Sequence, residues 1–270
     1  IKTEWEDNLT STDGDTSDSK VSPKVGLVYK LSDTLSMYAN YAEAFLSPSV
    51  DKLSHSEGLD PENATSYEIG VKGAFGKIFT YEVTYYNMEV KDRIVVEYHP
   101  DWTYEYKNVG KTTAQGMEFG GEFFIFEGLS VPINYTYTES KYEDYVYDDY
   151  DPITWQITPI DCEDKNVVNV PKHKVNIGIR YTNPAGLNAS VMAKWVDEMY
   201  VDPMNNHKLD DHITFDAKVS YDWGKWSFYL VGNNIFGKKY SDTAYYAGAG
   251  VCKYYPMHEG YYMGGVSYKF

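Results

Sequence analysis

The last eleven residues of the chain alternate apolar and polar side chains and end on an aromatic residue, Phe270. If this segment is a strand, one of its faces carries Tyr262, Gly264, Val266, Tyr268 and Phe270, and the other carries Met263, Gly265, Ser267 and Lys269. Such a terminal strand needs a neighbour for its backbone and a non-aqueous medium for its rings. An outer-membrane β-barrel supplies both, because closure pairs the last strand and lipid covers the aromatic side chains.

The composition fits a barrel and excludes a helical membrane protein. Tyrosine contributes 28 residues, and aromatic residues make up 17% of the chain beside 24% charged residues. No stretch approaches the ~18 uninterrupted apolar residues of a membrane helix. Because a barrel strand turns only every second side chain toward lipid, a mean hydropathy of −0.51 is compatible with membrane strands.

The charged and sulfur-containing residues limit the possible partners. A net charge of −16 argues against nucleic acid, which binds surfaces rich in lysine and arginine. Arg93 and Arg180 are the only arginines, so bidentate clamps for carboxylate or phosphate are scarce. Two cysteines, Cys162 and Cys252, form neither a dense disulfide framework nor a zinc motif. We therefore expect no nucleic-acid partner, no metal site and no cofactor.

Alternation with a period of two recurs along the whole chain. In 212–221, for example, Ile213, Phe215, Ala217 and Val219 alternate with polar residues, as expected for a half-buried strand. The pattern predicts about twelve strands, near residues 1–6, 21–30, 35–45, 64–75, 78–96, 103–126, 129–142, 170–181, 187–200, 211–221, 225–235 and 260–270. An even number of strands places both chain ends on the same side of the sheet.

The connections between these strands are of two kinds. Short breaks occur near 31–33, 76–77, 127–128, 182–186 and 222–224, whereas long polar breaks occur near 7–20, 46–63, 97–103, 143–170, 201–210 and 237–259. Antiparallel hairpins with short turns on one side and long loops on the other are typical of outer-membrane barrels. The strands at 78–96 and 103–126 exceed the ~9–11 residues that cross a bilayer, so we expect a hairpin that projects outward.

Aromatic residues gather beside the predicted short turns. In a soluble β-sandwich the apolar faces would meet in a dry core, and rings would be spread along each strand. The observed clustering instead favours an aromatic girdle at one membrane interface. The residues assigned to it include Phe75, Phe79, Tyr181, Tyr221, Trp226, Phe228, Tyr268 and Phe270.

An ordered set of short motifs resembles the carboxyl-terminal part of TonB-dependent outer-membrane receptors, of the siderophore-receptor type. Each motif is weak alone, but together they run in the same order over almost all of 21–270. The matching segments are 22–29 (SPKVGLVY), 35–48, 61–72 (PENATSYEIGVK), 108–119 (NVGKTTAQGMEF), 170–174, 232–240 (GNNIFGKKY) and the terminal aromatic strand.

The resemblance implies an all-β, transmembrane, antiparallel up-and-down barrel of 22 strands with an amino-terminal plug inside it. Residues 1–270 would form the carboxyl-terminal portion of the barrel, without the plug. A closed barrel of twelve strands, in which 1–6 pairs with 261–270, is the alternative. The implied partners are the lipid bilayer, a scarce ligand such as an iron–siderophore complex, the TonB complex through the missing amino-terminal part, and the barrel assembly machinery through the last strand.

Two long loops carry the candidate ligand-binding residues. In 139–151, acidic residues interleave with tyrosines, and this lip could capture a cationic or metal-bearing ligand; it could equally be a solvated loop. In 237–259, the tyrosines and a histidine could line a vestibule or pack between loops. The candidates are Tyr142, Tyr145, Tyr147, Asp148, Asp149, Tyr150, Tyr245, Tyr246, Tyr254, Tyr255 and His258.

Other residues have expected places in the barrel. Glu68, Glu118, Glu122 and Arg180 fall on the polar face and should point into the lumen, where the family places its plug. They could also be plain solvated lumen residues. Cys162 and Cys252 both fall in long outside loops, where an oxidising environment would allow a disulfide between them. Each could instead be free or pair with a residue outside this chain.

These observations predict a receptor and transporter rather than an enzyme. The sequence has no Gly-x-Ser-x-Gly elbow, no phosphate-binding loop and no histidine pair at helical metal-binding spacing. We expect an outer-membrane protein that takes up a scarce ligand by active, TonB-dependent transport, most often an iron–siderophore complex in this family. A passive pore and a cobalamin receptor are the alternatives.

Overall fold

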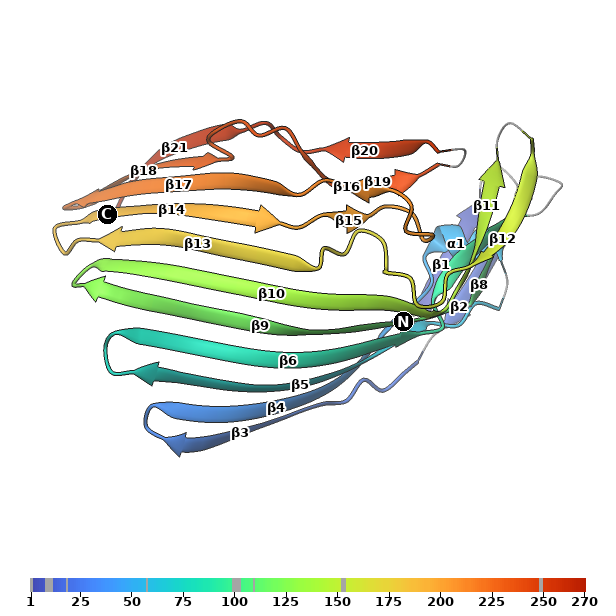
Figure 1. Ribbon diagram of the computed structural model, residues 1–270, viewed down its shortest axis with the longest axis horizontal. Helices are drawn as coiled ribbons and strands as arrows, with labels where there is room; N and C mark the ends of the chain where they lie inside the picture. Colours follow the sequence, from blue (N-terminus) through green and yellow to red (C-terminus); the bar gives the residue numbers. More distant parts are fainter. Residues whose placement is uncertain are drawn as a thin grey trace.

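The computed structural model describes residues 2–7, 12–17, 19–56, 58–98, 103–108, 110–151, 154–247 and 250–270. Eleven strands form one large sheet (Figure 1). They are β3 (Lys24–Ser32), β4 (Leu35–Leu46), β5 (Glu62–Phe75), β6 (Phe79–Lys91), β9 (Lys111–Phe126), β10 (Leu129–Asp144), β13 (His173–Thr182), β14 (Leu187–Val196), β17 (His212–Trp223), β18 (Trp226–Asn233) and β21 (Tyr261–Tyr268).

The large sheet is an antiparallel meander in which each strand pairs with the next one along the chain. Its order is β21-β18-β17-β14-β13-β10-β9-β6-β5-β4-β3, and it is open at both edges within the described residues. The prediction of an all-β, up-and-down antiparallel architecture is confirmed. The sheet is curved but does not close on itself, so the small closed barrel is not formed.

Smaller elements lie beyond the long-loop end of the sheet (Figure 1). Five two-stranded hairpins pair locally, and one short helix follows β4. They are β1 (Lys2–Asp7) with β2 (Thr12–Ser17), β7 (Ile94–Tyr98) with β8 (Tyr104–Asn108), β11 (Val146–Asp151) with β12 (Gln156–Asp161), β15 (Met199–Tyr200) with β16 (Lys208–Leu209), β19 (Ser241–Tyr246) with β20 (Cys252–Pro256), and α1 (Val50–His55).

Three expectations about the strands need correction. Eleven strands, not twelve, form the sheet, because β1 pairs with β2 in a separate hairpin; Ile1 lies outside the described residues. Because the sheet has eleven strands, an odd number, its first strand, β3, begins on the long-loop side and its last strand, β21, ends on the short-turn side. The hairpin expected over 78–96 and 103–126 does project outward, but its tip is a separate sheet, β7–β8.

The short turns are built as the sequence suggested. Gly76, Gly128, Gly186 and Gly224 lie in the turns after β5, β9, β13 and β17, and each has a positive φ between 57° and 102°. This conformation is open to glycine because it lacks a Cβ atom. These turns all lie at one end of the sheet, opposite the hairpins (Figure 1).

The two faces of the sheet differ in chemistry. Cross-strand register places apolar residues such as Ile69, Phe123 and Ile179 on one face, where their side chains are 53%, 42% and 58% exposed. We call this the convex face. The opposite, concave face carries polar residues such as Glu82 and Arg180. The apolar faces of the strands do not meet in a dry core, which excludes a soluble β-sandwich.

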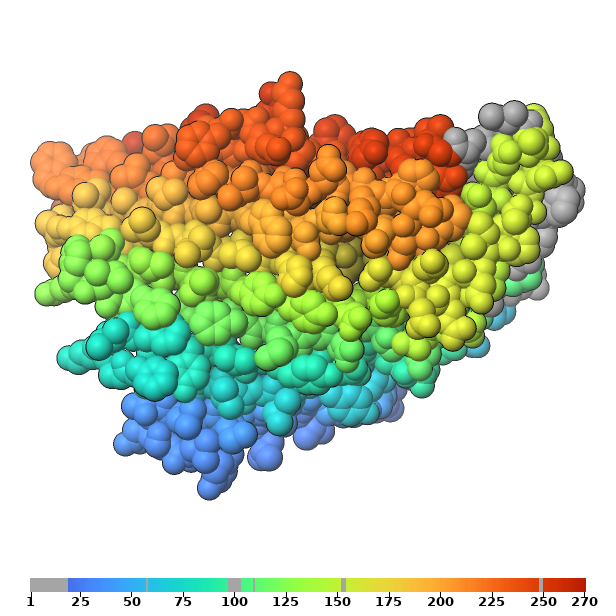
Figure 2. Space-filling view, viewed as in Figure 1, coloured from blue at the N-terminus to red at the C-terminus, as the bar shows by residue number. Residues whose placement is uncertain are grey.

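The buried apolar core of the described residues lies in the outer segments instead. Met199, Val201, Leu209 and Ala244 pack together with Cys252 against them. We call this group the outer cluster. Figure 2 shows the strands side by side in one continuous layer, with the β11–β12 hairpin rising beyond one end. The sheet itself is held by its backbone ladders rather than by a core.

Candidate functional site: the concave wall and the outer hairpins

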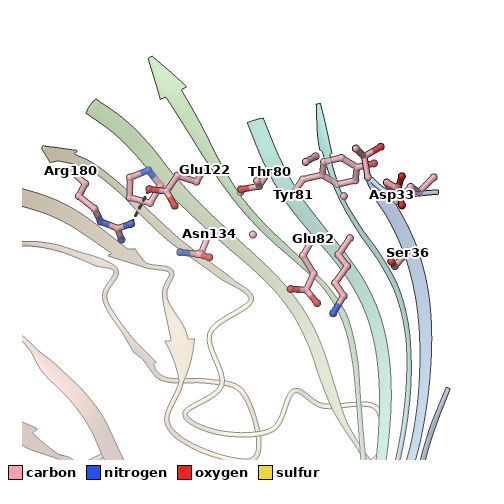
Figure 3. A pocket seen from close by; sticks show the side chains of 16 residues that line it. Asp33, Ser36, Thr80, Tyr81, Glu82, Glu122, Asn134 and Arg180 are labelled. Atoms are coloured by element: carbon pink, nitrogen blue, oxygen red, sulfur yellow. Dashed lines mark hydrogen bonds and ion pairs between the residues drawn. The ribbon is translucent and has the colours of Figure 1, made fainter. Parts of the chain in front are cut away.

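A cavity of about 620 Å³ opens on the concave face near the short-turn end of the sheet. Figure 3 shows its side chains projecting from several neighbouring strands into the space that the curved sheet partly encloses. The labelled lining residues are Asp33, Ser36, Thr80, Tyr81, Glu82, Glu122, Asn134 and Arg180. Most of these side chains are polar, so the wall suits a polar occupant.

An ion pair joins the middle of this wall. Arg180 Nη1 on β13 lies 2.9 Å from Glu122 Oε1 on β9, and Ser130 Oγ on β10 donates a 2.6 Å hydrogen bond to the same oxygen. The two charged side chains remain 51% and 24% exposed. Partial exposure limits the strength of such a pair to about 1 kcal/mol, so both groups can still bind an occupant of the cavity.

The other side of the cavity carries a second set of opposite charges. Lys72 on β5 and Glu82 on β6 are opposite each other in the strand register. The Lys72 ammonium also lies 5.8 Å from the centre of the Tyr38 ring. The wall therefore presents both signs of charge along one row, which suits a ligand or segment with donors and acceptors rather than a simple ion.

Two further glutamates of the predicted lumen set share this face but lie outside the cavity lining. Asn40 Nδ2 donates to Glu68 Oε2 at 3.1 Å, and Glu118 stands between Thr84 and Thr136 in the register. The structure therefore brings Glu122 and Arg180 into contact, and places Glu68 and Glu118 further toward the loop end. Contact of any of them with a plug stays a prediction.

Tyrosines on the concave wall lie flat across glycines. The Tyr38 hydroxyl reaches over Gly70 to Thr84 Oγ1 at 2.5 Å, and the Tyr86 hydroxyl reaches over Gly116 to Thr138 Oγ1 at 2.7 Å. A Cβ atom on Gly70 would lie 2.4 Å from the Tyr38 ring. Each glycine thus lets a ring lie along the wall, and the enclosed space stays open.

The acidic tyrosine loop is partly folded inward. Tyr142 is only 5% exposed and stacks on Tyr145 with ring centroids 4.6 Å apart. Burial, reinforced by Tyr142, raises the pKa of the Tyr145 phenol. Tyr142 packs between segments in this structure, whereas Tyr145 and Asp148 line a cavity of about 600 Å³. Tyr147, Asp148, Asp149 and Tyr150 lie half-buried on β11.

Asp149 is the unusual carboxylate of this hairpin. Its Oδ1 is buried without a hydrogen-bond partner. Burial, with repulsion from Asp151 and Asp202, raises the pKa of Asp149. Sequence alone could not single it out from its acidic neighbours, because its distinction is burial, which depends on how the outer segments pack together.

The second candidate loop forms the β19–β20 hairpin. Tyr245, Tyr254 and Tyr255 are 42%, 53% and 57% exposed, and the rings of Tyr245 and Tyr255 lie 5.9 Å apart. The Lys253 ammonium lies 5.6 Å from the Tyr245 ring centre. Tyr246, in contrast, stacks on His207 at 5.0 Å. His258 is exposed and contacts Tyr261 edge-on.

Sequence reasoning missed the residues that organise these loops. Asp202 is fully buried, and its carboxylate accepts the backbone N–H groups of Asn206 and His207 at 2.9 and 2.6 Å. Asn169 exchanges two hydrogen bonds with the backbone of Ala244, at 3.0 and 3.2 Å. The Asn169 N–H also donates to the Tyr200 carbonyl at 2.8 Å, so Asn169 links the segment 199–209 to the β19–β20 hairpin.

Both cysteines are free thiols in the structure, so the possible bridge is not formed in it. Cys162 is fully buried and Cys252 packs against the outer cluster. Burial raises the pKa of both thiols. No trio of His, Cys, Asp and Glu side chains within the described ranges is arranged to hold a metal ion. No helix in the same ranges is long and apolar enough to cross a membrane.

Lys72, Glu82 and Asn134 line the cavity, yet sequence reasoning did not select them. A signal was available. All three fall on the polar side of the alternation and close to a short turn. Residues at equal distances from the short turns lie side by side on neighbouring strands. A single strand does not show which polar residues of its neighbours lie at the same distance from the turns, because this depends on the register between strands.

Comparison with known proteins agrees with this architecture. Residues 2–235 match the family described as "TonB dependent receptor-like, beta-barrel", and the chain belongs to this family. The family consists of receptors and transporters of the outer membrane, and the chain is an outer-membrane protein. The resemblance found in the motifs is confirmed.

Individual relatives match at low identity. The "Ferrioxamine receptor" of Yersinia enterocolitica is 26% identical over 254 residues, which is 91% of this chain and 33% of that protein. The "Vitamin B12 transporter BtuB" of Vibrio vulnificus is 33% identical over 109 residues, 40% of this chain and 18% of that protein. This chain thus spans a third or less of these two relatives.

A solved structure supports the fold. The ferric citrate transporter FecA in its unliganded form superposes with a TM-score of 0.73 at 19% identity. The match covers 98% of this chain and 40% of that one. At this identity the likeness shows the shared strand meander alone, and says nothing of the ligand.

Proposed function

We propose that this chain is the carboxyl-terminal part of the barrel of a receptor that takes up an iron–siderophore complex by active, TonB-dependent transport. The observation that carries the proposal is the division of the sheet into an apolar convex face and a polar concave face with a cavity, within a chain of the TonB-dependent receptor family. Relatives such as the Ferrioxamine receptor support the ligand class.

In this proposal, the convex face contacts lipid and the aromatic girdle lies at the periplasmic interface. The concave wall, with Glu122 and Arg180, contacts a plug domain from outside this chain. The plug passes the ligand signal to the TonB complex. The terminal strand β21 is the segment that the barrel assembly machinery would recognise. The barrel carries out no covalent chemistry.

The charge of the outer segments indicates what kind of complex is taken up. Residues 139–170 contain nine acidic and two basic residues, and residues 197–211 contain five acidic and one basic residue. These two segments thus carry 11 of the 16 net negative charges. A field of this sign raises the local concentration of cations and repels strongly anionic catecholate complexes. Neutral or cationic hydroxamate complexes fit best.

Growth on defined iron sources tests the proposal. A strain that lacks the gene should lose growth on one or more ferric siderophores as sole iron source, and the full-length gene should restore it. Normal growth of the mutant on every siderophore would reject siderophore uptake. A matched pair of linear ferric trihydroxamates, one with a free terminal amine and one with that amine acetylated, tests the charge preference at the same time.

Cobalamin uptake is the second candidate, because the BtuB relative is 33% identical over 109 residues, whereas the Ferrioxamine receptor is 26% identical over 254 residues. The same deletion strain answers this, by growth that depends on external cobalamin. A passive pore would admit small solutes without TonB, so uptake that survives removal of TonB would favour a pore over both receptors.

A further inference from the structure

The convex face is not evenly filled. Over β5, β6 and β9, ring side chains pack closely, with the centroids of Phe79 and Phe123 only 4.1 Å apart. Over β13, β14, β17 and β18, in contrast, Ala189 and Ala217 have short side chains and Gly232 has none. A groove of about 400 Å³ therefore remains. Its lining is almost wholly apolar, so water would gain few hydrogen bonds there.

The groove has fixed walls. Tyr181 stands opposite Ala189 at one end, and Tyr262 stands opposite Gly232 at the other. The Tyr262 hydroxyl donates a 2.9 Å hydrogen bond to the Ile235 carbonyl, which holds the ring in place. A Cβ atom on Gly232 would lie 2.8 Å from this ring. The small residues and the anchored tyrosine together give the groove a defined shape.

One lysine lies on the same side of the sheet as the groove, at the short-turn edge. Lys225 is in the short turn between β17 and β18, and its carbonyl accepts the Lys269 N–H at 2.8 Å. The Lys225 side chain is exposed, and its ammonium lies 5.9 Å from the centre of the Tyr268 ring on the convex face. Lys269 follows Tyr268 in the alternation and falls on the concave side. Leu230, in the groove, is four residues along β18 from Trp226, a distance of about 13 Å.

We propose that this groove and Lys225 bind one glycerophospholipid of the periplasmic leaflet. One acyl chain lies in the groove across Ala189, Ala217 and Gly232, and the phosphate contacts Lys225. The short turns mark the periplasmic end of an outer-membrane barrel, and the inner leaflet there consists of glycerophospholipids. The proposal rests on the membrane placement in the proposed function, and adds a specific lipid site to it.

Native mass spectrometry of the full-length receptor, purified from outer membranes in mild detergent, tests the proposal. We expect a species that carries one glycerophospholipid after delipidating washes. The double substitution Ala189→Phe and Ala217→Phe fills the groove and should lower the lipid-bound fraction about tenfold, which corresponds to about 1.4 kcal/mol. Ala39→Phe, on the same face of β4 and far from the groove, is the control and should retain the lipid.

The lysines provide a second test that leaves the groove intact. Lys225→Gln should weaken lipid retention about fivefold, as expected for one basic side chain at an anionic surface, whereas Lys269→Gln, on the opposite face, is the control and should retain the lipid. Heat-modifiable migration in gels should show that every variant is folded. Retention of lipopolysaccharide in place of glycerophospholipid, no retained lipid in the folded wild type, or equal retention by the filled variant would each overturn the site.

The same preparations separate this proposal from the proposed function. A receptor that supports iron uptake but holds no phospholipid removes the lipid site alone. A receptor that holds the lipid but transports no siderophore removes the transport proposal and leaves the site standing.

Discussion

The sheet and the outer cluster of this chain are held together in different ways. In the sheet, apolar residues such as Ile69 and Ile179 stay more than half exposed on one face, and the strands are joined by backbone ladders. In the outer cluster, Val201 and Met199 are 2% and 5% exposed and pack as in a soluble protein. One chain thus keeps the apolar residues of its sheet on an open face and packs those of its outer cluster into a dry core.

The largest expected effect falls on the sheet, at a glycine under a flat ring. Gly116→Ala would place a Cβ atom 2.0 Å from the Tyr137 carbonyl oxygen and 2.6 Å from the Tyr86 hydroxyl. Because backbone must move, we expect a loss of about 3 kcal/mol in the free energy of unfolding. Urea unfolding of the full-length protein in detergent measures it.

Gly120→Ala is the matched control on the same strand and face. Its Cβ atom would meet only the Asn134 amide oxygen, at 3.3 Å, and that side chain can move aside. Equal losses for the two variants would mean that the close approach of the Tyr137 carbonyl and the Tyr86 ring is not what makes Gly116 necessary.

A smaller and local effect is expected in the outer cluster. Val201→Ala removes buried apolar atoms and leaves a cavity, so the cluster should lose about 2 kcal/mol of local stability. Hydrogen exchange should show faster exchange in 199–209 and 241–246, with the sheet unchanged. Val251→Ala, at a position that is 52% exposed, is the control. If Val201→Ala also loosened the sheet, the two regions would not be independent.

The thiols offer a chemical probe of the same contrast. Because burial raises the pKa of both thiols, little thiolate is present at neutral pH, and labelling should accelerate as the pH rises. Cys162 is fully buried, so maleimide should label Cys252 about tenfold faster or more. Single serine variants assign each rate. Thiols that label only after reduction would show a disulfide and contradict the free state.

The smallest effect is expected on the concave wall. Arg180→Gln removes the 2.9 Å pair with Glu122, but the arginine is 51% exposed and water screens it. Stability should change by less than about 1 kcal/mol. A double-mutant cycle with Glu122→Gln measures the coupling between the two side chains. A coupling well above that limit would mean that the wall is less solvated than its exposure indicates.

Much of the sheet could be read from single strands. The alternation at 212–221, the glycines at the short turns and the polar row containing Glu122 and Arg180 each depend on local sequence, since strand periodicity and turn conformation are local properties. The girdle residues from Phe75 to Tyr268 fall on the convex face, as the alternation predicted. Their role at the membrane interface stays a prediction.

The arrangement between strands could not be read in this way. The pairing of β1 with β2 replaced the expected twelfth strand because a local hairpin closes a shorter loop than a distant edge does. Tyr142 belongs to the predicted lip, yet it is almost fully buried against Tyr145. Both outcomes depend on which distant segment approaches, and one strand carries no record of that.

The sequence by itself therefore determined the strand meander, its sidedness and its family, because these follow from periods of two residues, turn glycines and short motifs. The tertiary structure decided which residues meet. Register brought Glu122 within reach of Arg180, folding brought Ala244 against Val201, and small residues on three strands combined to leave a groove. These contacts depend on packing between segments far apart in the chain. Local patterns do not specify them, because many sequences share the same local pattern.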